Sequence, residues 1–126
     1  QAFAKANKNG GAIVNISSIL GLKPQGLPQA AYASSKAGLI GLTRDLAAQW
    51  TGRKNIRVNA LAPGFFPSEM SDELPKDMVN MIKMFTPAGR LGDPEELAAT
   101  LIWLVSDASS YVTGITVPVD GGLVMP

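Results

Sequence analysis

The sequence of 126 residues contains no cysteine and no histidine. Without cysteine, neither a disulfide framework nor a thiolate metal site can form. Without histidine, the chain lacks the commonest metal ligand and the usual catalytic base at neutral pH. We therefore predict no metal site, and we expect any proton chemistry to come from tyrosine, lysine, aspartate or glutamate.

Strong charge and long apolar runs are absent as well. The formal net charge is +1 and no basic run interrupts the sequence, which argues against a nucleic-acid partner. No apolar run approaches the ~20 residues needed to span a bilayer, and the first residues lack a signal-peptide core. With 46% apolar residues, the composition suits one modest domain of a cytoplasmic protein without a membrane partner.

Three residues whose side chains could take part in catalysis lie in the first third of the chain: Ser18, Tyr32 and Lys36. The apolar run from Ala12 to Ile16, with its unbroken Ala-Ile-Val pattern, predicts a parallel strand buried on both faces, and the serine follows it. A helix is predicted from about Ala30 to Trp50. Because the tyrosine and the lysine are four residues apart in that helix, they lie on one face.

This arrangement can support proton transfer to a carbonyl. The positive charge of Lys36 favours the phenolate of Tyr32 and lowers its pKa from the usual value of about 10. The Ser18 hydroxyl can hydrogen-bond the oxygen of a reacting carbonyl. A plain turn at the end of a strand is the alternative interpretation of Ser17 and Ser18.

A second strand is predicted from Asn55 to Ala62, and it runs into Pro63-Gly64. Joined to the first strand by a helix, it forms a parallel βαβ unit, which we expect to be right-handed. Its loop would then lie beside the serine and the tyrosine. A short last strand, from Ile115 to Val119, is placed at a sheet edge because Pro118 cannot donate a ladder hydrogen bond.

Two further segments are predicted to be helical. Residues 70–85 form one or two short helices interrupted at Pro75, and their apolar side chains suit either a substrate lid or core filling. These side chains are Met70, Met78, Met81, Ile82, Met84 and Phe85. A third helix starts at Asp93 as N-cap, with Pro94 at its first position and Glu96 completing a capping box, so these acids are structural. We expect that helix to fray from Ser106 to Ser110 and to bury Leu97, Leu101, Leu104 and Val105.

The helix that carries Tyr32 has two apolar rows. A bulky row is predicted to be core, and it consists of Leu39, Leu42, Leu46 and Trp50. A second row of small residues, Ala33, Ala37 and Gly41, allows another helix to approach closely. It indicates either tight packing on the chain's own sheet or an interface between subunits.

Four motifs follow one another in the chain: N-I-S-S at Asn15 to Ser18, Y-A-S-S-K at Tyr32 to Lys36, R-V-N-A-L-A-P-G at Arg57 to Gly64, and V-T-G-I-T-V-P-V-D-G-G at Val112 to Gly122. In this combination and order the sequence resembles the short-chain dehydrogenase/reductase family, specifically its short, single-domain members. The resemblance covers nearly the whole chain.

The resemblance implies roles for individual residues. Tyr32 would be the general acid in carbonyl reduction or the base in alcohol oxidation, Lys36 would also hold the cofactor ribose, and Ser18 would position the substrate oxygen. The family usually separates serine and tyrosine by thirteen positions, whereas Ser18 and Tyr32 are fourteen apart. One extra residue in the loop from Gly21 to Gln29 accounts for this difference and favours Ser18 over Ser17.

The cofactor implied by the resemblance is NAD or NADP. The backbone near Pro63, Gly64 and Phe66 would contact its nicotinamide carboxamide, and Ser68 stands where the family commonly has a threonine hydroxyl. The chain opens on Gln1 in what reads as the end of a helix, and it contains no G-x-x-x-G-x-G motif. We therefore expect upstream strands and helices that carry the pyrophosphate site and the residue that distinguishes NAD from NADP.

The predicted fold is an α/β, doubly wound parallel sheet of the Rossmann type, of which residues 1–126 form the C-terminal half, a single incomplete NAD(P)-binding domain. The predicted function is an NAD(P)-dependent oxidoreductase acting on a small-molecule carbonyl or secondary alcohol, as a homodimer or homotetramer, with residues 1–126 inactive by themselves. P-G-F-F-P-S-E-M and R-L-G-D-P-E-E are similar to both 3-oxoacyl reductases and polyol or sugar-acid dehydrogenases. A non-catalytic dinucleotide-binding or scaffold protein is the alternative. A nucleotide-sugar epimerase or dehydratase would need a larger C-terminal domain.

Overall fold

The computed structural model describes residues 2–6, 9–26, 28–67 and 75–125. Its strands are β1 (Gly11–Ile16), β2 (Ile56–Pro63) and β3 (Thr116–Val119). Its helices are α1 (Ala2–Ala6), α2 (Ala30–Lys54), α4 (Lys76–Phe85) and α5 (Pro94–Val105), with two short 3-10 turns, η1 (Ile19–Gly21) and η2 (Asp107–Ser109). None of the described helices is long and apolar enough to cross a membrane.

The strands form one parallel sheet in the order β1-β2-β3. Gly11 pairs with Ile56 at one end of the first ladder, and Pro63 pairs with Val119 at the end of the second. The predicted parallel α/β arrangement of the Rossmann type is thereby confirmed. The last strand lies at an edge of the sheet, as Pro118 indicated, and the Pro118 side chain is exposed.

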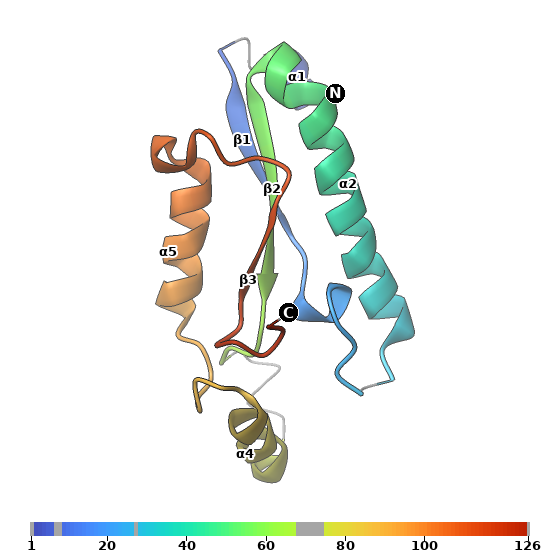
Figure 1. The fold of residues 1–126 in the computed structure, drawn as a ribbon, viewed down its shortest axis with the longest axis vertical. Helices are drawn as coiled ribbons and strands as arrows, with labels where there is room; N and C mark the ends of the chain where they lie inside the picture. The colour runs from blue at the N-terminus through green and yellow to red at the C-terminus, as the bar shows by residue number, and fades with distance from the viewer. Residues whose placement is uncertain (1, 7–8, 27, 68–74, 126) are drawn as a thin grey trace.

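Helices cover both faces of the sheet. Ala47 of α2 packs against Ile56 and Val58, whereas Arg57, between them on β2, reaches the end of α5 on the other face. Figure 1 shows α2 and α5 on opposite sides of the strands. Because the sheet advances in one direction from β1 to β3 while the two helices lie on opposite faces, the two crossovers have opposite hands. The right-handed rule therefore describes only one of them.

α2 is longer than predicted, and its buried row differs. It continues to Lys54 and ends at Asn55, whose φ of 55° is left-handed and whose N–H donates to the Thr51 carbonyl oxygen. The prediction that Leu42 is core is wrong, because its side chain is 46% exposed. The fully packed positions are Ile40, Thr43 and Ala47, while the bulky residues Leu39, Leu46 and Trp50 are half-buried. Periodicity gives the spacing of a row but not which row meets the sheet.

The row of small residues on α2 does not pack on the sheet. Ala37 and Gly41 are exposed, Ala33 is half-buried, and a Cβ built on Gly41 would meet nothing within 4 Å. Within the described residues, the side chain of Ala37 and the open side of Gly41 therefore do not pack on the sheet. An open helix face with small side chains remains.

α5 begins as predicted and ends differently. The capping box is present: the Asp93 carboxylate accepts from the Glu95 N–H, and Glu96 accepts from the Asp93 N–H. Leu104 is buried, but Val105 is 49% exposed, so its predicted burial is wrong. The expected fraying after Val105 is also wrong. The buried Ser109 hydroxyl donates back to the last turn, and η2 forms there.

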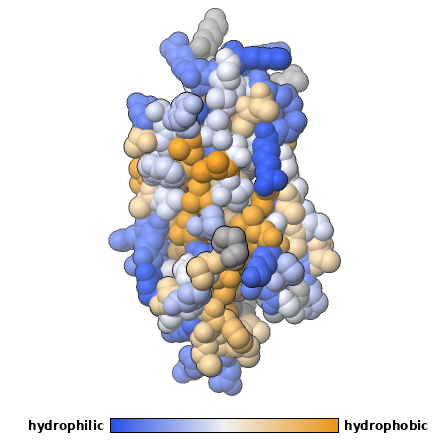
Figure 2. Space-filling model, viewed as in Figure 1, coloured by the Kyte–Doolittle hydropathy of each residue, from blue (hydrophilic) through white to orange (hydrophobic). Residues whose placement is uncertain are grey.

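α4 projects beyond the carboxyl ends of the strands (Figure 1). None of its residues is buried, and the exposed fraction is 84% for Met84 and 72% for Phe85. Figure 2 shows weakly to strongly apolar residues gathered at this end of the molecule. Core filling within the described chain is therefore not the role of α4. Met70 lies outside the described residues.

Candidate active site

Two serines directly follow β1, and their hydroxyl groups are used differently. Ser17 is 3% exposed, and its hydroxyl donates to the backbone carbonyl oxygen of Lys36 at 2.8 Å. Ser18 is 6% exposed, and its oxygen accepts from the Leu20 N–H at 3.1 Å as the N-cap of η1. The proton of Ser17 is therefore committed, while that of Ser18 remains available for a bond to another oxygen.

Tyr32 and Lys36 meet on the first turns of α2. The Lys36 ammonium nitrogen lies 5.5 Å from the centroid of the Tyr32 ring, within the range of a cation–π contact. The same nitrogen donates to the carbonyl oxygen of Ile16 at 3.0 Å, two residues before Ser18. Tyr32 is 46% exposed. The lysine thus links the tyrosine to the end of the strand that carries the serine.

The seam between α2 and β1 is held by polar contacts. The Asn15 amide donates to the Thr43 hydroxyl at 2.9 Å, and Thr43 donates to the Leu39 carbonyl oxygen. A Cβ built on Gly21 would lie 2.8 Å from the Lys36 carbonyl carbon, so η1 touches the helix backbone. These contacts fix the helix against the strand along the stretch where the three candidate residues lie.

The 63–66 loop, Pro63-Gly64-Phe65-Phe66, begins at the last residue of β2, beside this seam. The Ser17 N–H donates to the Leu61 carbonyl oxygen at 2.7 Å, which sets the end of β1 next to the end of β2. The Phe66 ring packs on Gly92, and the Gly92 N–H donates to the Phe65 carbonyl oxygen at 3.0 Å. Of the predicted cofactor contacts, Ser68 lies outside the described residues.

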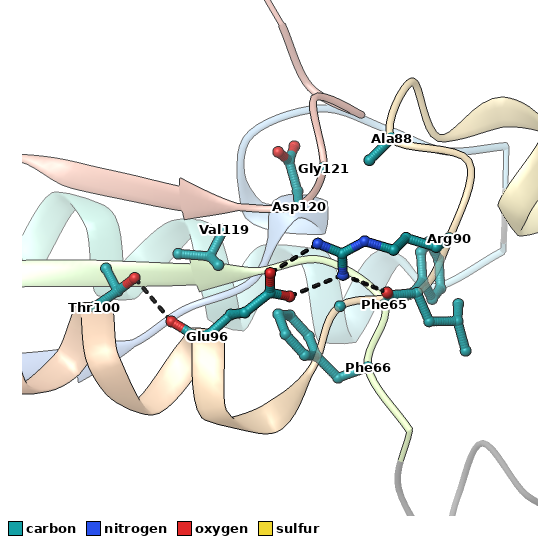
Figure 3. Close-up of a pocket in the computed structure, with 11 residues that line it drawn as sticks. Phe65, Phe66, Ala88, Arg90, Glu96, Thr100, Val119, Asp120 and Gly121 are labelled. Atoms are coloured by element: carbon teal, nitrogen blue, oxygen red, sulfur yellow. Dashed lines mark hydrogen bonds and ion pairs between the residues drawn. The ribbon is translucent and has the colours of Figure 1, made fainter.

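A pocket of about 200 Å³ lies behind the 63–66 loop (Figure 3). Its polar rim is an ion pair in which the Arg90 guanidinium donates twice to the Glu96 carboxylate, at 2.7 and 2.9 Å. These bonds, together with one from the Asp93 N–H, lower the pKa of Glu96 from 4.5 to about 2, and the carboxylate raises the pKa of Arg90. Because the charges of Arg90 and Glu96 pair with each other, this ion pair stabilises the turn before α5. The pocket is distinct from the Ser18, Tyr32 and Lys36 group.

The donors of the candidate site suit the nicotinamide half of a dinucleotide and a carbonyl substrate. An ammonium group has three N–H donors, and Lys36 uses one on Ile16, so two remain for ribose hydroxyl oxygens. Ser18 and Tyr32 can both donate to a carbonyl oxygen. The sequence contains no glycine-rich motif for the pyrophosphate. Among the residues that the structure describes, no three carboxylates gather to hold a metal ion.

Two features of the site did not emerge from the sequence. The bond from Ser17 to the Lys36 carbonyl joins residues 19 positions apart, and no local pattern signals it. Asp120 organises the turn after β3, where its carboxylate accepts from the Gly122 and Val124 N–H groups. The run Asp-Gly-Gly is a signal for such a turn, because aspartate accepts from the backbone two residues on.

Comparisons with known proteins match nearly the whole chain. A family model described as enoyl-(acyl carrier protein) reductase matches residues 1–124. The chain is 49% identical over 116 residues to a 3-oxoacyl-(acyl-carrier-protein) reductase from Thermotoga maritima, a match that covers 91% of this chain and 46% of that protein.

Solved structures agree with the sequence match. A 3-oxoacyl-(acyl-carrier protein) reductase from Brucella melitensis superposes with a TM-score of 0.90 at 40% identity, covering 99% of this chain and 46% of that one. A gluconate 5-dehydrogenase from Burkholderia cenocepacia in complex with NADP and tartrate gives 0.88 at 36% identity, covering 99% and 49%. The chain therefore spans about half the length of the relatives that it matches.

Proposed function

The chain belongs to the short-chain dehydrogenase/reductase family, and on that premise we propose that the full-length protein is an NAD(P)-dependent oxidoreductase that interconverts a carbonyl and a secondary alcohol. The observation that carries the proposal is the Lys36 ammonium, which lies over the Tyr32 ring and bonds the strand end beside Ser18. Lys36 thus connects Tyr32 to the strand end that precedes Ser18, and the carboxyl ends of parallel strands are where such sheets commonly bind ligands.

In the direction of reduction, Ser18 and Tyr32 both act on the carbonyl oxygen of the substrate. Ser18 donates a hydrogen bond to the carbonyl oxygen, and Tyr32 transfers its phenolic proton to that oxygen. The cofactor, when bound, supplies the hydride that the carbonyl carbon receives. The proton transfer leaves a phenolate on Tyr32, and the adjacent positive charge of Lys36 stabilises it.

The cofactor contacts form the next part of the proposal. Lys36 would donate to the ribose hydroxyl groups, and the backbone of Pro63, Gly64 and Phe66 would contact the carboxamide, with Ser68 nearby. NADP occupies the gluconate 5-dehydrogenase structure, and NAD is the other candidate for this chain. The reaction also needs a pyrophosphate site outside residues 1–126, because this sequence has no glycine-rich motif.

α4 is proposed to contact the substrate. Its exposed apolar side chains include Met78, Met81, Met84 and Phe85, and methionine adapts to ligands of irregular shape. The relatives described above are named for the 3-oxoacyl group on acyl carrier protein and for gluconate. Both remain candidates for the full-length protein.

A second copy of the chain is the proposed protein partner, in a homodimer or homotetramer. The open face of α2 supports this, because Ala37 and Gly41 are exposed and a Cβ on Gly41 would meet nothing within 4 Å. Small side chains let two helices approach closely.

The test is a reductase assay of the full-length protein with NADPH and NADH on a 3-oxoacyl thioester and on a keto-gluconate. We expect turnover with one of them, and Tyr32→Phe should lower it by at least ~100-fold, because a general acid is lost. Tyr111→Phe is the matched control, since Tyr111 follows η2 and its side chain is fully exposed. Wild-type turnover in Tyr32→Phe would exclude the proposed role.

A further inference from the structure

Asp120 is the first residue after β3, and both of its carboxylate oxygens are occupied. One accepts from the Gly122 N–H at 2.9 Å and the other from the Val124 N–H at 2.7 Å. The two following glycines have φ values of 65° and 90°, a left-handed conformation that glycine adopts without strain. Residues 120–124, here called the C-terminal turn, therefore depend on an acceptor with two oxygens, which a carboxylate supplies and an amide does not.

The C-terminal turn lies directly against Gly64 of the 63–66 loop. The Gly64 N–H donates to the Val119 carbonyl oxygen at 2.9 Å. A Cβ built on Gly64 would lie 2.7 Å from the Cα of Asp120 and 2.8 Å from its Cβ, closer than real Cβ atoms come. The backbone of the loop therefore rests on the backbone of Asp120, and a shift of one displaces the other.

The other side of the C-terminal turn is held by the segment after α4. The Ala88 N–H donates to the Gly121 carbonyl oxygen at 3.0 Å, and a Cβ on Gly121 would lie 2.8 Å from the Thr86 methyl carbon. Figure 3 shows Asp120 and Ala88 on the same side of the Arg90 and Glu96 pair. The turn is thus wedged between this segment and the 63–66 loop.

We infer that Asp120 is a positioning residue for the nicotinamide end of the cofactor, an inference that rests on the proposed function. Its carboxylate folds the C-terminal turn, the turn supports Gly64, and Gly64 presents the loop backbone that would contact the carboxamide. Both carboxylate oxygens are committed to backbone N–H groups, so Asp120 acts through the loop rather than on a ligand. Removing the Asp120 carboxylate therefore weakens binding of the nicotinamide end of the cofactor. Binding of the adenine end, which lies elsewhere, is unchanged.

The experiment measures two affinities in the full-length protein. NADPH and NADH are titrated by cofactor fluorescence, and ADP-ribose or its 2′-phosphate, which lacks nicotinamide, is titrated by calorimetry. We expect Asp120→Asn, which keeps one acceptor oxygen, to weaken dinucleotide binding about tenfold, the effect of one lost charge-assisted hydrogen bond. Asp120→Ala loses both acceptor oxygens and should weaken binding by at least as much. Binding of the truncated ligand should stay within about twofold of wild type, as for changes away from a site.

Two further variants sharpen the test. Gly64→Ala should reproduce the selective loss, because its methyl group would displace the Asp120 backbone. In the double variant with Asp120→Ala, the combined loss should be smaller than the product of the single losses, since both act through one contact. Asp107→Asn is the matched control, because this acid is exposed in η2 and is expected to leave both affinities unchanged.

The outcomes separate this inference from the proposed function. If wild type binds both ligands and Asp120→Ala binds them equally well, the positioning role is wrong while the oxidoreductase proposal stands. If both affinities fall in parallel, Asp120 serves only folding, and the inference is overturned. If wild type binds neither ligand, the proposed function fails, and the positioning role fails with it.

Discussion

Two polar groups of the molecule, one at the end of β1 and one at the end of α5, differ in how much hydrogen-bonding capacity they leave free. At the end of α5, the Arg57 guanidinium donates to the carbonyl oxygens of Leu104, Ser106 and Val112 and to the Ser109 hydroxyl. Every partner there belongs to the chain itself. Arg57 thus caps the carboxyl end of α5 and holds the segment that leads to β3.

At the end of β1, donors remain available. Ser18 accepts a bond but keeps its proton, Lys36 uses one of three N–H groups, and Tyr32 is 46% exposed. The comparison teaches that both terminal nitrogens of Arg57 donate to the chain, whereas the candidate active site keeps the Ser18 proton and two N–H groups of Lys36 available. Variants at the first group should change stability, and variants at the second should change turnover.

The largest effect is expected from the pair of serines. Ser18→Ala should lower turnover of the full-length protein by at least ~100-fold, because a donor to the reacting oxygen is lost. Ser17→Ala removes the bond to the Lys36 carbonyl oxygen and should cost about 1 kcal/mol of stability while most of the turnover remains. Steady-state kinetics and thermal melts decide between them. If Ser17→Ala loses more turnover than Ser18→Ala, Ser17 is the catalytic donor and Ser18 the structural residue.

The next effect concerns stability. Arg57→Ala should lower the free energy of unfolding by about 3 kcal/mol, because several half-buried acceptors lose a charged donor at once. Arg53→Ala, on an exposed residue at the end of α2, is the control and should cost less than about 1 kcal/mol. Urea unfolding of both variants measures the difference. Equal stabilities would show that the end of α5 does not depend on Arg57.

Much of the fold could be predicted from the sequence because its signals are local. The capping box at Asp93 and Glu96 and the edge position of Pro118 each rest on a few neighbouring residues, and the structure confirms them. The end of α5 could not be predicted, because the order after Val105 comes from Arg57, some 50 residues earlier in the chain. Leu42 was misplaced for a related reason, since spacing alone does not say which helix row faces the sheet.

The candidate site shows the same division. The spacing of Tyr32 and Lys36 predicted a shared helix face, and the structure brings the ammonium over the ring. Which of the two serine hydroxyl groups remains free to donate depends on the bond from Ser17 to the Lys36 carbonyl oxygen of α2, and no sequence pattern signals that bond. The support of Gly64 by Asp120 joins residues 56 positions apart and is likewise visible only in three dimensions.

A smaller effect is expected on assembly. Gly41→Leu, and less strongly Ala37→Leu, should shift the full-length protein toward smaller assemblies, because a bulky side chain prevents close approach of a second helix. Gly52→Leu is the matched control, since Gly52 is also exposed on α2 with open space around it. Light scattering decides. An unchanged assembly size in Gly41→Leu would exclude this face of α2 as an interface.

The smallest effect concerns pH. It tests whether the ion pair between Arg90 and Glu96, behind the 63–66 loop, only stabilises the fold or also titrates near neutral pH. The bonds from Arg90 and the Asp93 N–H lower the pKa of Glu96 to about 2 in the folded chain, below its ordinary value of 4.5. A depressed carboxyl pKa adds stability that is fully present above about pH 4.5 and is lost as the pH falls toward 2. Glu96→Gln should therefore lower the melting temperature by a constant amount above that window, and its gap from wild type should close within it. Melting curves at a series of pH values give this result. A gap that varies near neutral pH would mean that Glu96 titrates there, and the contrast between a satisfied ion pair and a reactive site would have to be withdrawn.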